Sequence, residues 1–448
     1  MRRRARLPRG QVLVFLLPLL AVLGAAAWWA FEAGQVVTEK QRLRDAAEAA
    51  ALSGAVWQAR SLNFAAAMNR AVIANEAVIA QSISLRSWSD YMNRLLPTAS
   101  VLTSYVPYLN AATATLQRWW SGFDSVLRPS LRGLEGLSSG VSHSLAAAQR
   151  FMLSATLLTV PQIVRDTVEA TDPRFRLTEG GEVQLLAWAA QWQNFSSFYG
   201  GSWRWRQQDV LLRSLDGFTH ERNFTLSPLL GSRLVRFEKR AGTDLLDFET
   251  WRALDTLSLH QPRYVIFGSM RERAAIAWGG ADNGVGSRLR GRHGDALRRN
   301  PRAARAAEWS ISRQRGYRGL PSLYDLSAAQ RAESGPPRVV VRLRLPATSR
   351  RGAAELLGFR SVLRGAGDTV ALAPEPTNGS TNGSGDLFAE AAATTRFLRL
   401  EPRRDGAEEA PSLYSPYWRS TLASLSIPDR VLLATVDGTP VWLAGVPR

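Results

Sequence analysis

The 448-residue sequence contains no cysteine, which excludes disulfides, thiolate metal sites and a cysteine nucleophile. Lysine is almost absent: the only two lysines are Lys40 and Lys239, and arginine supplies the rest of the 56 basic residues. This bias, beside abundant alanine, is as typical of a GC-rich genome as of selected charge. A formal charge of +18 alone would suggest an anionic partner. No nucleic-acid-binding module accompanies that charge, so we expect no specific nucleic-acid partner.

Motifs for chemistry are also missing. The four histidines form no paired motif and join no carboxylate cluster, so each is interpreted as a surface or incidental histidine. The glycine-rich segment 279–287 lacks the lysine of a phosphate-binding loop, and we interpret it as a flexible turn in a mobile loop near 279–319. Asp325 begins a segment like a metal-adhesion motif, but alanine replaces its second serine ligand. We therefore predict no catalytic residue, cofactor, metal or small-molecule substrate.

One uncharged apolar run, residues 12–31, is long enough to cross a bilayer as a helix. Five arginines lie before it, and the positive-inside rule therefore predicts a cytoplasmic segment at 1–10, a transmembrane helix at 11–31 and an exported body. The alternative is a signal peptide cleaved after Ala27. Apolar character continues past Ala27 to Phe31, which favours an uncleaved anchor.

A stripe of mostly small or apolar residues follows the span at alternating steps of four and three, the spacing of one face of a long helix. Small residues let another helix approach closely, so we predict a helix-packing seam. Its members are Leu43, Ala47, Ala50, Gly54 and Trp57. We expect this helix to end at Pro97. A second helical stretch at 99–167 should fold back on it and complete a helical region at 32–174.

The remainder, residues 175–448, has the texture of a mixed, strand-rich domain, so the predicted fold class is α+β. Strands are predicted at 233–237, 263–267, 338–345 and 396–400, with a C-terminal hairpin formed by 431–436 and 441–446. Alternation predicts that strand 338–345 is half-buried, with Arg342 and Arg344 on one face. Helices are predicted at 183–192 and 386–393. Residues 373–385 form a low-complexity segment, interpreted as a mobile loop.

Ten arginines lie between positions 288 and 318, with Trp309 and Tyr317 among them. Such a surface is able to contact phosphate, lipid head groups or acidic polysaccharide. The alternative is a solvated loop without a partner. The residues that would make this possible anionic-surface contact are Arg288, Arg290, Arg292, Arg298 and Arg299.

Two N-terminal segments resemble a known family. Residues 9–11 before the apolar run and 41–55 after it are similar to the N-terminal segment of the TadE/TadG-like proteins of the tight-adherence (Tad) pilus apparatus. Residues 69–71, 75–76 and 412–419 resemble segments of larger members. The resemblance implies an inner-membrane protein with a periplasmic body that takes part in pilus assembly. Members cut by a prepilin peptidase carry glutamate five residues after the cleaved glycine; Phe15 at that position favours an uncleaved protein.

We therefore interpret the chain as a membrane-anchored, non-catalytic component of Tad pilus assembly. Its expected partners are other pilus-assembly membrane proteins and the inner membrane. One alternative is an exported enzyme acting on envelope polysaccharide, if carboxylates such as Asp244, Asp247 and Glu249 converge in a pocket. A third interpretation is an arginine-rich module that binds anionic envelope polymers.

Overall fold

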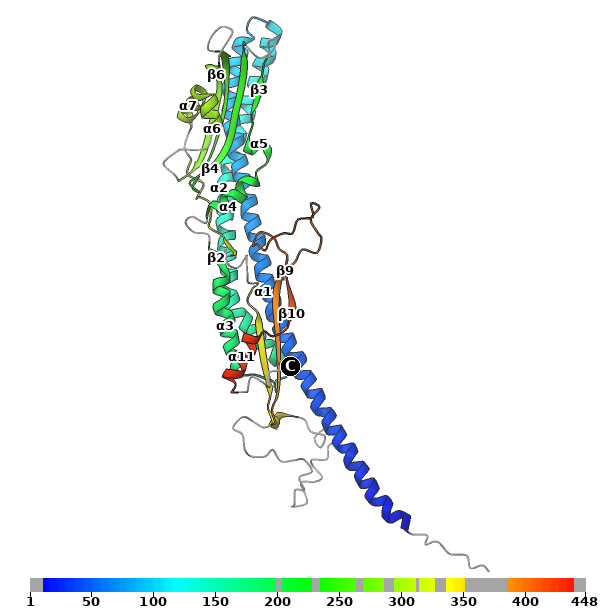
Figure 1. The fold of residues 1–448 in the computed structure, drawn as a ribbon. Helices are drawn as coiled ribbons and strands as arrows, with labels where there is room; N and C mark the ends of the chain where they lie inside the picture. Colours follow the sequence, from blue (N-terminus) through cyan, green and yellow to red (C-terminus); the bar gives the residue numbers. More distant parts are fainter. Residues whose placement is uncertain are drawn as a thin grey trace, which may run out of the picture.

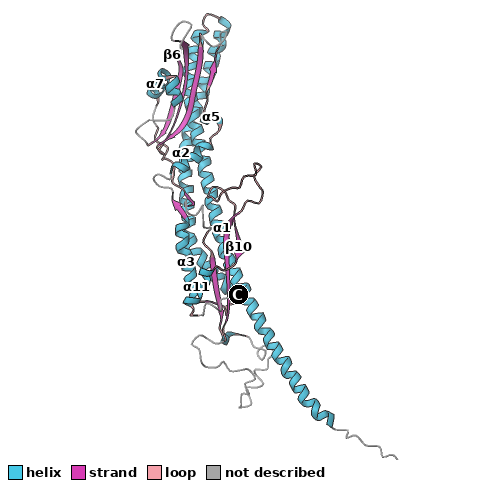
Figure 2. Cartoon of the chain, in the orientation of Figure 1, coloured by secondary structure: helices cyan, strands magenta, loops and turns pink. Residues whose placement is uncertain are grey.

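The structure is a computed structural model. It describes residues 11–198, 204–227, 234–262, 269–285, 294–311, 314–326, 336–350 and 385–438. Two long helices run through the molecule, and the strands lie along them (Figures 1 and 2). This arrangement confirms the predicted fold class: a long N-terminal helix, a second helix and a strand-rich remainder.

Helix α1 spans Gln11–Leu102 and α2 spans Pro107–Thr171, and the two pack against each other as an antiparallel hairpin. At about 1.5 Å per residue, α1 alone is about 138 Å long. The prediction that Pro97 ends the helix was wrong, because α1 continues for five more residues beside the start of α2. There Ser100 of α1 donates to Asn110 of α2 at 3.2 Å, and Thr103 Oγ1 in the turn lies 3.0 Å from Thr113 Oγ1 of α2. Proline at the first position of α2 costs no hydrogen bond.

The distal part of the hairpin carries a four-stranded antiparallel sheet in the order β3-β4-β5-β6. Its strands are β3 Phe224–Leu226, β4 Arg236–Leu246, β5 Thr250–Pro262 and β6 Met270–Gly284. The short helices α4 Arg204–Arg213, α5 Gly217–His220, α6 Gly294–Arg299 and α7 Pro301–Ser310 lie around it (Figure 1).

Two sequence interpretations fail in this sheet. Gly279 and Gly280 lie in β6 and not in a flexible turn. A Cβ atom on Gly279 would lie 2.1 Å from the carbonyl oxygen of Ser87, so glycine is needed because the strand backbone touches α1. The predicted mobile loop near 279–319 likewise contains the end of β6 and helices α6 and α7.

The proximal part of the hairpin carries a second antiparallel sheet in the order β1-β8-β9-β10. Its strands are β1 Arg176–Leu177, β8 Val339–Leu345, β9 Leu387–Phe397 and β10 Trp418–Ala423. Helices α3 Glu179–Phe195 and α11 Ile427–Val436 pack beside it. The remaining elements are a short 3-10 turn, Ala347–Ser349, and a two-stranded pair, β2 Ser196–Phe198 with β7 Tyr324–Leu326.

Two of the elements predicted for this region are present in the structure. The helix at 183–192 is confirmed as part of α3, and strand 338–345 is confirmed as β8. Residues 386–393 were predicted helical but form β9, and 431–436 were predicted as a strand but lie in α11. Ser426 starts α11 with a capping box to Asp429. Segments 263–267, 373–384 and 441–446 lie outside the described residues.

Strand β8 is also more buried than predicted. Arg342 is buried, because β8 is covered by α1 on one side and by α3 on the other, and it pairs with Asp437 at 3.1 Å. Arg344 is exposed. Residues before and after position 174 share one hydrophobic cluster, which joins Leu43 and Ala50 of α1 to Leu343 of β8. The division at residue 174 into a helical region and a separate domain stays a prediction.

Candidate functional site

The seam of small residues on α1 is buried inside the chain itself. Leu43, Ala47, Ala50 and Gly54 are buried, and Trp57 is partly buried against the same cluster. These residues face α2 and the proximal sheet, which are the packing partners that the structure provides.

Gly54 shows how close this packing is. A Cβ atom at this position would lie 3.0 Å from Val339 Cγ1 of β8 and 3.1 Å from Val164 Cγ2 of α2. A larger side chain would push apart three elements at once: α1, α2 and β8. A substitution here is therefore expected to disturb the proximal sheet, whether or not it affects another protein.

Beyond the seam, α1 presents polar side chains to loops from distant parts of the sequence. The Asn69 side-chain amide donates to the carbonyl oxygens of Tyr324 and Leu413, both at 2.8 Å. Its own oxygen accepts from Gln149 of α2 at 2.5 Å. Asp325 Oδ1 accepts from the Leu413 backbone at 2.9 Å. Asn69 thus closes a junction among α1, α2 and two C-terminal segments.

A second asparagine holds the same C-terminal segment. Asn63 Nδ2 donates to the Trp418 carbonyl at 2.9 Å, and the Trp418 backbone N–H donates back to Asn63 Oδ1 at 3.0 Å. Segments 69–71 and 412–419, which both resemble larger family members, therefore meet in space although about 340 residues separate them. The resemblance of these segments corresponds to one structural junction.

Glu76 is the most perturbed carboxyl group at the helix–sheet interface. It is fully buried and accepts hydrogen bonds from Tyr317 Oη at 2.7 Å and Trp251 Nε1 at 3.1 Å. Burial raises the pKa of Glu76 to about 7, and the two hydrogen bonds oppose that rise only in part. The group therefore changes charge near neutral pH inside the protein.

Closer to the hairpin tip, the interface holds buried ion pairs. Arg86 of α1 and Glu135 of α2 pair at 2.8 Å, and Asn283 of β6 donates to the same carboxylate at 2.7 Å. Burial raises the pKa of Glu135, and the Arg86 charge opposes that rise. Ser87 donates to Asp255 of β5 at 2.8 Å. Sequence reasoning missed these contacts, because their partners lie 49 to 168 residues apart.

The structure describes only part of the predicted arginine cluster. Arg288, Arg290 and Arg292 lie outside the described residues, whereas Arg298 and Arg299 lie exposed on α6. The latter two border a hollow of about 420 Å³. Glu272 borders it too and accepts from the first backbone N–H groups of α7, so the surface is not purely basic.

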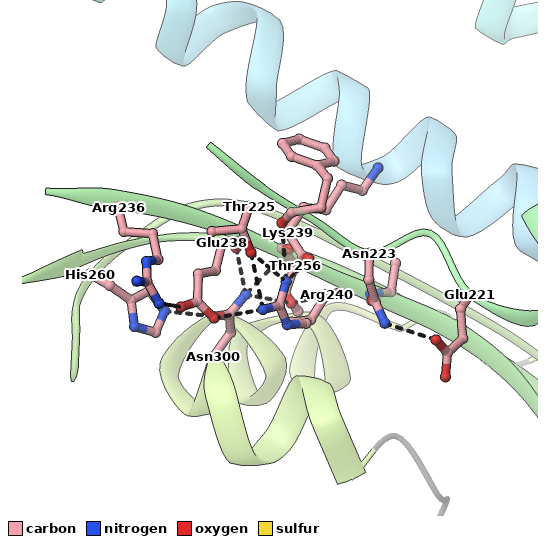
Figure 3. Close-up of polar contacts among 12 residues, drawn as sticks. Glu221, Asn223, Thr225, Arg236, Glu238, Lys239, Arg240, Thr256, His260 and Asn300 are labelled. Carbon is pink, nitrogen blue, oxygen red and sulfur yellow. Dashed lines mark hydrogen bonds and ion pairs between the residues drawn. The ribbon is translucent and has the colours of Figure 1, made fainter. Parts of the chain in front are cut away.

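Tyr317 and His260 do not lie at the surface, contrary to the prediction from the sequence. Tyr317 is fully buried against Glu76 and is not available to a surface ligand, whereas Trp309 is exposed. His260 is buried and not a surface residue, because α6 and the segment after it cover this side of the sheet. Its Nε2 lies 2.8 Å from Asn300 Oδ1, and Asn300 in turn donates to the Glu238 carbonyl and to Thr256 (Figure 3).

Carboxylates gather at one further place. Asp244 and Asp247 border a hollow of about 270 Å³ together with Asp209 of α4, and Glu249 is not among its lining residues. Asp209 forms an ion pair with Arg213 at 3.0 Å. Within the described ranges, no three His, Cys, Asp or Glu side chains are grouped so that they could hold a metal ion.

The similarity to known proteins lies in the N-terminal part of α1. It contains one window long and apolar enough to cross a membrane, and none of that window is buried in the chain. Residues 10–59 match the family model of the putative Flp pilus-assembly TadE/G-like proteins. This Tad segment covers the apolar window and the seam as far as Trp57, which confirms the resemblance at the N-terminus. Neither a curated protein nor a solved structure matches the chain.

Proposed function

We propose that the chain is a membrane-anchored, non-catalytic component of Tad pilus assembly. Residues 11–31 hold it in the inner membrane, residues 1–10 stay in the cytoplasm, and the hairpin with its sheets lies in the periplasm. The observation that carries this proposal is the Tad segment: residues matched to a pilus-assembly family run, in one uninterrupted helix, from the apolar window into the core of the body.

This continuity suggests a mechanical role. From Phe31 to Leu102, α1 extends by about 107 Å at 1.5 Å per residue. The proximal sheet packs on the seam of this helix, and the distal sheet packs on its last turns. Helix α1 would then hold the two sheets at fixed distances from the membrane. At those distances the sheets can meet other assembly proteins.

The test removes anchoring without removing the body. Residues 1–31 are replaced by a cleavable signal peptide, so that the body is exported but released. We expect piliation to be lost, and restored when the native segment is returned. Normal piliation with the released body would contradict the anchored role.

A matched variant addresses the enzyme alternative. The double substitution Asp244→Asn and Asp247→Asn changes the carboxylates of the α4–β4 hollow and leaves the anchor intact. We expect wild-type piliation from this variant. Loss of piliation with an unchanged melting temperature would favour catalysis or ligand binding at this hollow instead.

A further inference from the structure

Helix α2 has large apolar side chains on the face that points away from α1. Eight of them are between 46% and 79% exposed, and we call them the outer stripe: Leu109, Leu116, Trp119, Phe123, Val126, Leu137, Phe151 and Leu158. Six of the eight are spaced by seven or fourteen residues. The α1-facing side repeats with the same period through Glu135, Ser142, Gln149 and Thr156, so the two lines stay on opposite sides of the helix.

Charged residues of α2 lie off the outer stripe, and the exposed Arg118 and Arg132 are on another side of the helix. Between positions 109 and 149, none of the charged residues lies on the outer stripe or at the heptad positions flanking it. Asp124 and Glu135 instead point inward and pair with arginines. The outer stripe is therefore a surface of the kind that helices bury against other helices.

Glycines provide a second observation. Gly122, Gly133, Gly136 and Gly140 lie within α2, and a Cβ atom on any of them would meet nothing within 4 Å. Glycine in a helix interior costs about 1 kcal/mol relative to alanine, and no packing inside this chain requires it. Such glycines allow the backbone of another helix to approach closely. A lipid surface would gain nothing from them.

We propose that α2 is a self-association surface, through which two copies of this chain pair side by side along the outer stripe. In a pair anchored in one membrane the α2 helices run parallel, so each residue of the outer stripe faces its own copy. A chain of charge +18 repels its copy least when the two meet through an uncharged surface. The proposed anchoring supplies only the parallel direction.

The outer stripe is large enough for this. At about 150 Å² for each side chain, the low end of the range for aromatic side chains, the observed fractions correspond to on the order of 700 Å² per copy. Standard interfaces bury about 800 Å² per partner. The outer stripe ends after Leu158, because the next position of this line, seven residues on, is Arg165, which is paired with Glu182.

The absence of cysteine makes a direct test possible, because one introduced cysteine is the only thiol. Leu116→Cys and Phe151→Cys are placed on the outer stripe, about 52 Å apart along the helix. Ser125→Cys, exposed on a different side of α2, is the control. Full-length protein is oxidised in membranes and again after purification in detergent, where other proteins are absent.

We expect disulfide-linked dimers of Leu116→Cys and of Phe151→Cys and none of Ser125→Cys, because a disulfide requires Cα atoms about 4.4–6.8 Å apart. Linkage at both positions of the outer stripe shows parallel pairing, whereas an antiparallel pair would link only near its crossing point. No dimer at either position, equal linkage at Ser125→Cys, or linkage only to a different protein would overturn the proposal.

A charge placed on the outer stripe should break the pair. Leu137→Arg, added to Phe151→Cys, places two like charges opposite each other, and we expect about a tenfold or greater loss of linked dimer. Leu137 is largely exposed, so the melting temperature of the monomer should not change. Unchanged linkage would overturn the proposal. Piliation is not the readout here, so failure of this test is distinct from failure of the proposed function.

Discussion

The two parts of the hairpin carry sheets of the same strand number on different kinds of surface. The proximal sheet packs on the seam, where α1 offers alanines, Leu43 and Gly54, and on the aromatic side chains of α3. The distal sheet forms hydrogen bonds with Glu76 and Ser87 of the same helix and with Glu135 of α2, which pairs with Arg86. The contacts of α1 with the two sheets, the proximal joint and the distal joint, therefore differ. The proximal joint is mainly apolar, whereas the distal joint adds buried charges and hydrogen bonds to its apolar clusters.

This difference has a physical consequence. An apolar joint tolerates small shifts, since its attraction has no preferred direction. If one partner of a buried polar contact moves away, the group left behind is unsatisfied, and this costs its full desolvation penalty. The distal sheet should therefore be fixed more exactly and be more sensitive to single polar substitutions. Four substitutions test this contrast, from the largest expected effect to the smallest.

Arg86→Met should have the largest effect. It leaves Glu135 buried beside Asn283 without its cation, and breaking such a pair costs about 3–5 kcal/mol in the free energy of unfolding. Thermal unfolding followed by tryptophan fluorescence measures the loss. The double variant Arg86→Met with Glu135→Leu removes both charges and should recover much of it. A single variant as stable as the wild type would contradict the polar joint.

Glu76 should make stability depend on pH. Its folded pKa of about 7 lies above the ordinary value of 4.5, so the folded state binds the proton more tightly. The contribution of Glu76 to stability is then full below pH 4.5 and is lost as the pH rises through about 7, by about 3 kcal/mol in total. Glu76→Gln keeps an acceptor for Tyr317 and should remove this decline. Equal slopes for both proteins between pH 5 and 8 would show that Glu76 is not its source.

Gly54→Leu should disturb the proximal joint by overpacking, at about 1–3 kcal/mol, because Val339 and Val164 leave no room. Gly54→Ala should cost less than Gly54→Leu. Gly34→Leu is the matched control on the same helix, since a Cβ atom there meets nothing within 4 Å. Proteolysis of the proximal sheet in Gly54→Leu, with the distal sheet intact, would separate the two joints. Similar melting temperatures for Gly54→Leu and Gly34→Leu would argue against the close contact.

Arg44→Ala should have the smallest effect. Arg44 and Glu48 form an exposed i,i+4 pair at 2.9 Å away from the seam, and such pairs contribute about 0.3–0.5 kcal/mol. A shift in melting temperature close to experimental error is expected. A loss as large as that of Gly54→Leu would mean that exposed charges of α1 contribute to the proximal joint.

Periodicity predicted much of the helical architecture and little of the joints. The seam spacing and the apolar content of 99–167 indicated α1 and α2, because long helices repeat their buried face many times. Strand β9 was missed because its alanines, such as Ala391 and Ala393, favour helix in isolation. They lie in a strand since pairing with β8 and contact with α1 override that preference.

The polar joint could not be predicted for a different reason. Periodicity and composition do not distinguish Glu76 or Arg86 from a surface residue of a helix. Their roles depend on Tyr317 and Glu135, which only the tertiary fold brings near. Gly279 shows the converse, because a glycine required by close backbone contact looks the same in sequence as a glycine in a turn.

The unbroken course of α1 between the apolar window and the hairpin tip makes the molecule a lever. Membrane helices tilt by about 20° on average. Over about 107 Å of helix, such a tilt displaces the far end sideways by roughly 35 Å. If residues 11–31 span the bilayer, small changes in how they sit there would be magnified at the distal sheet, and bilayer thickness would become a determinant of where that sheet is presented.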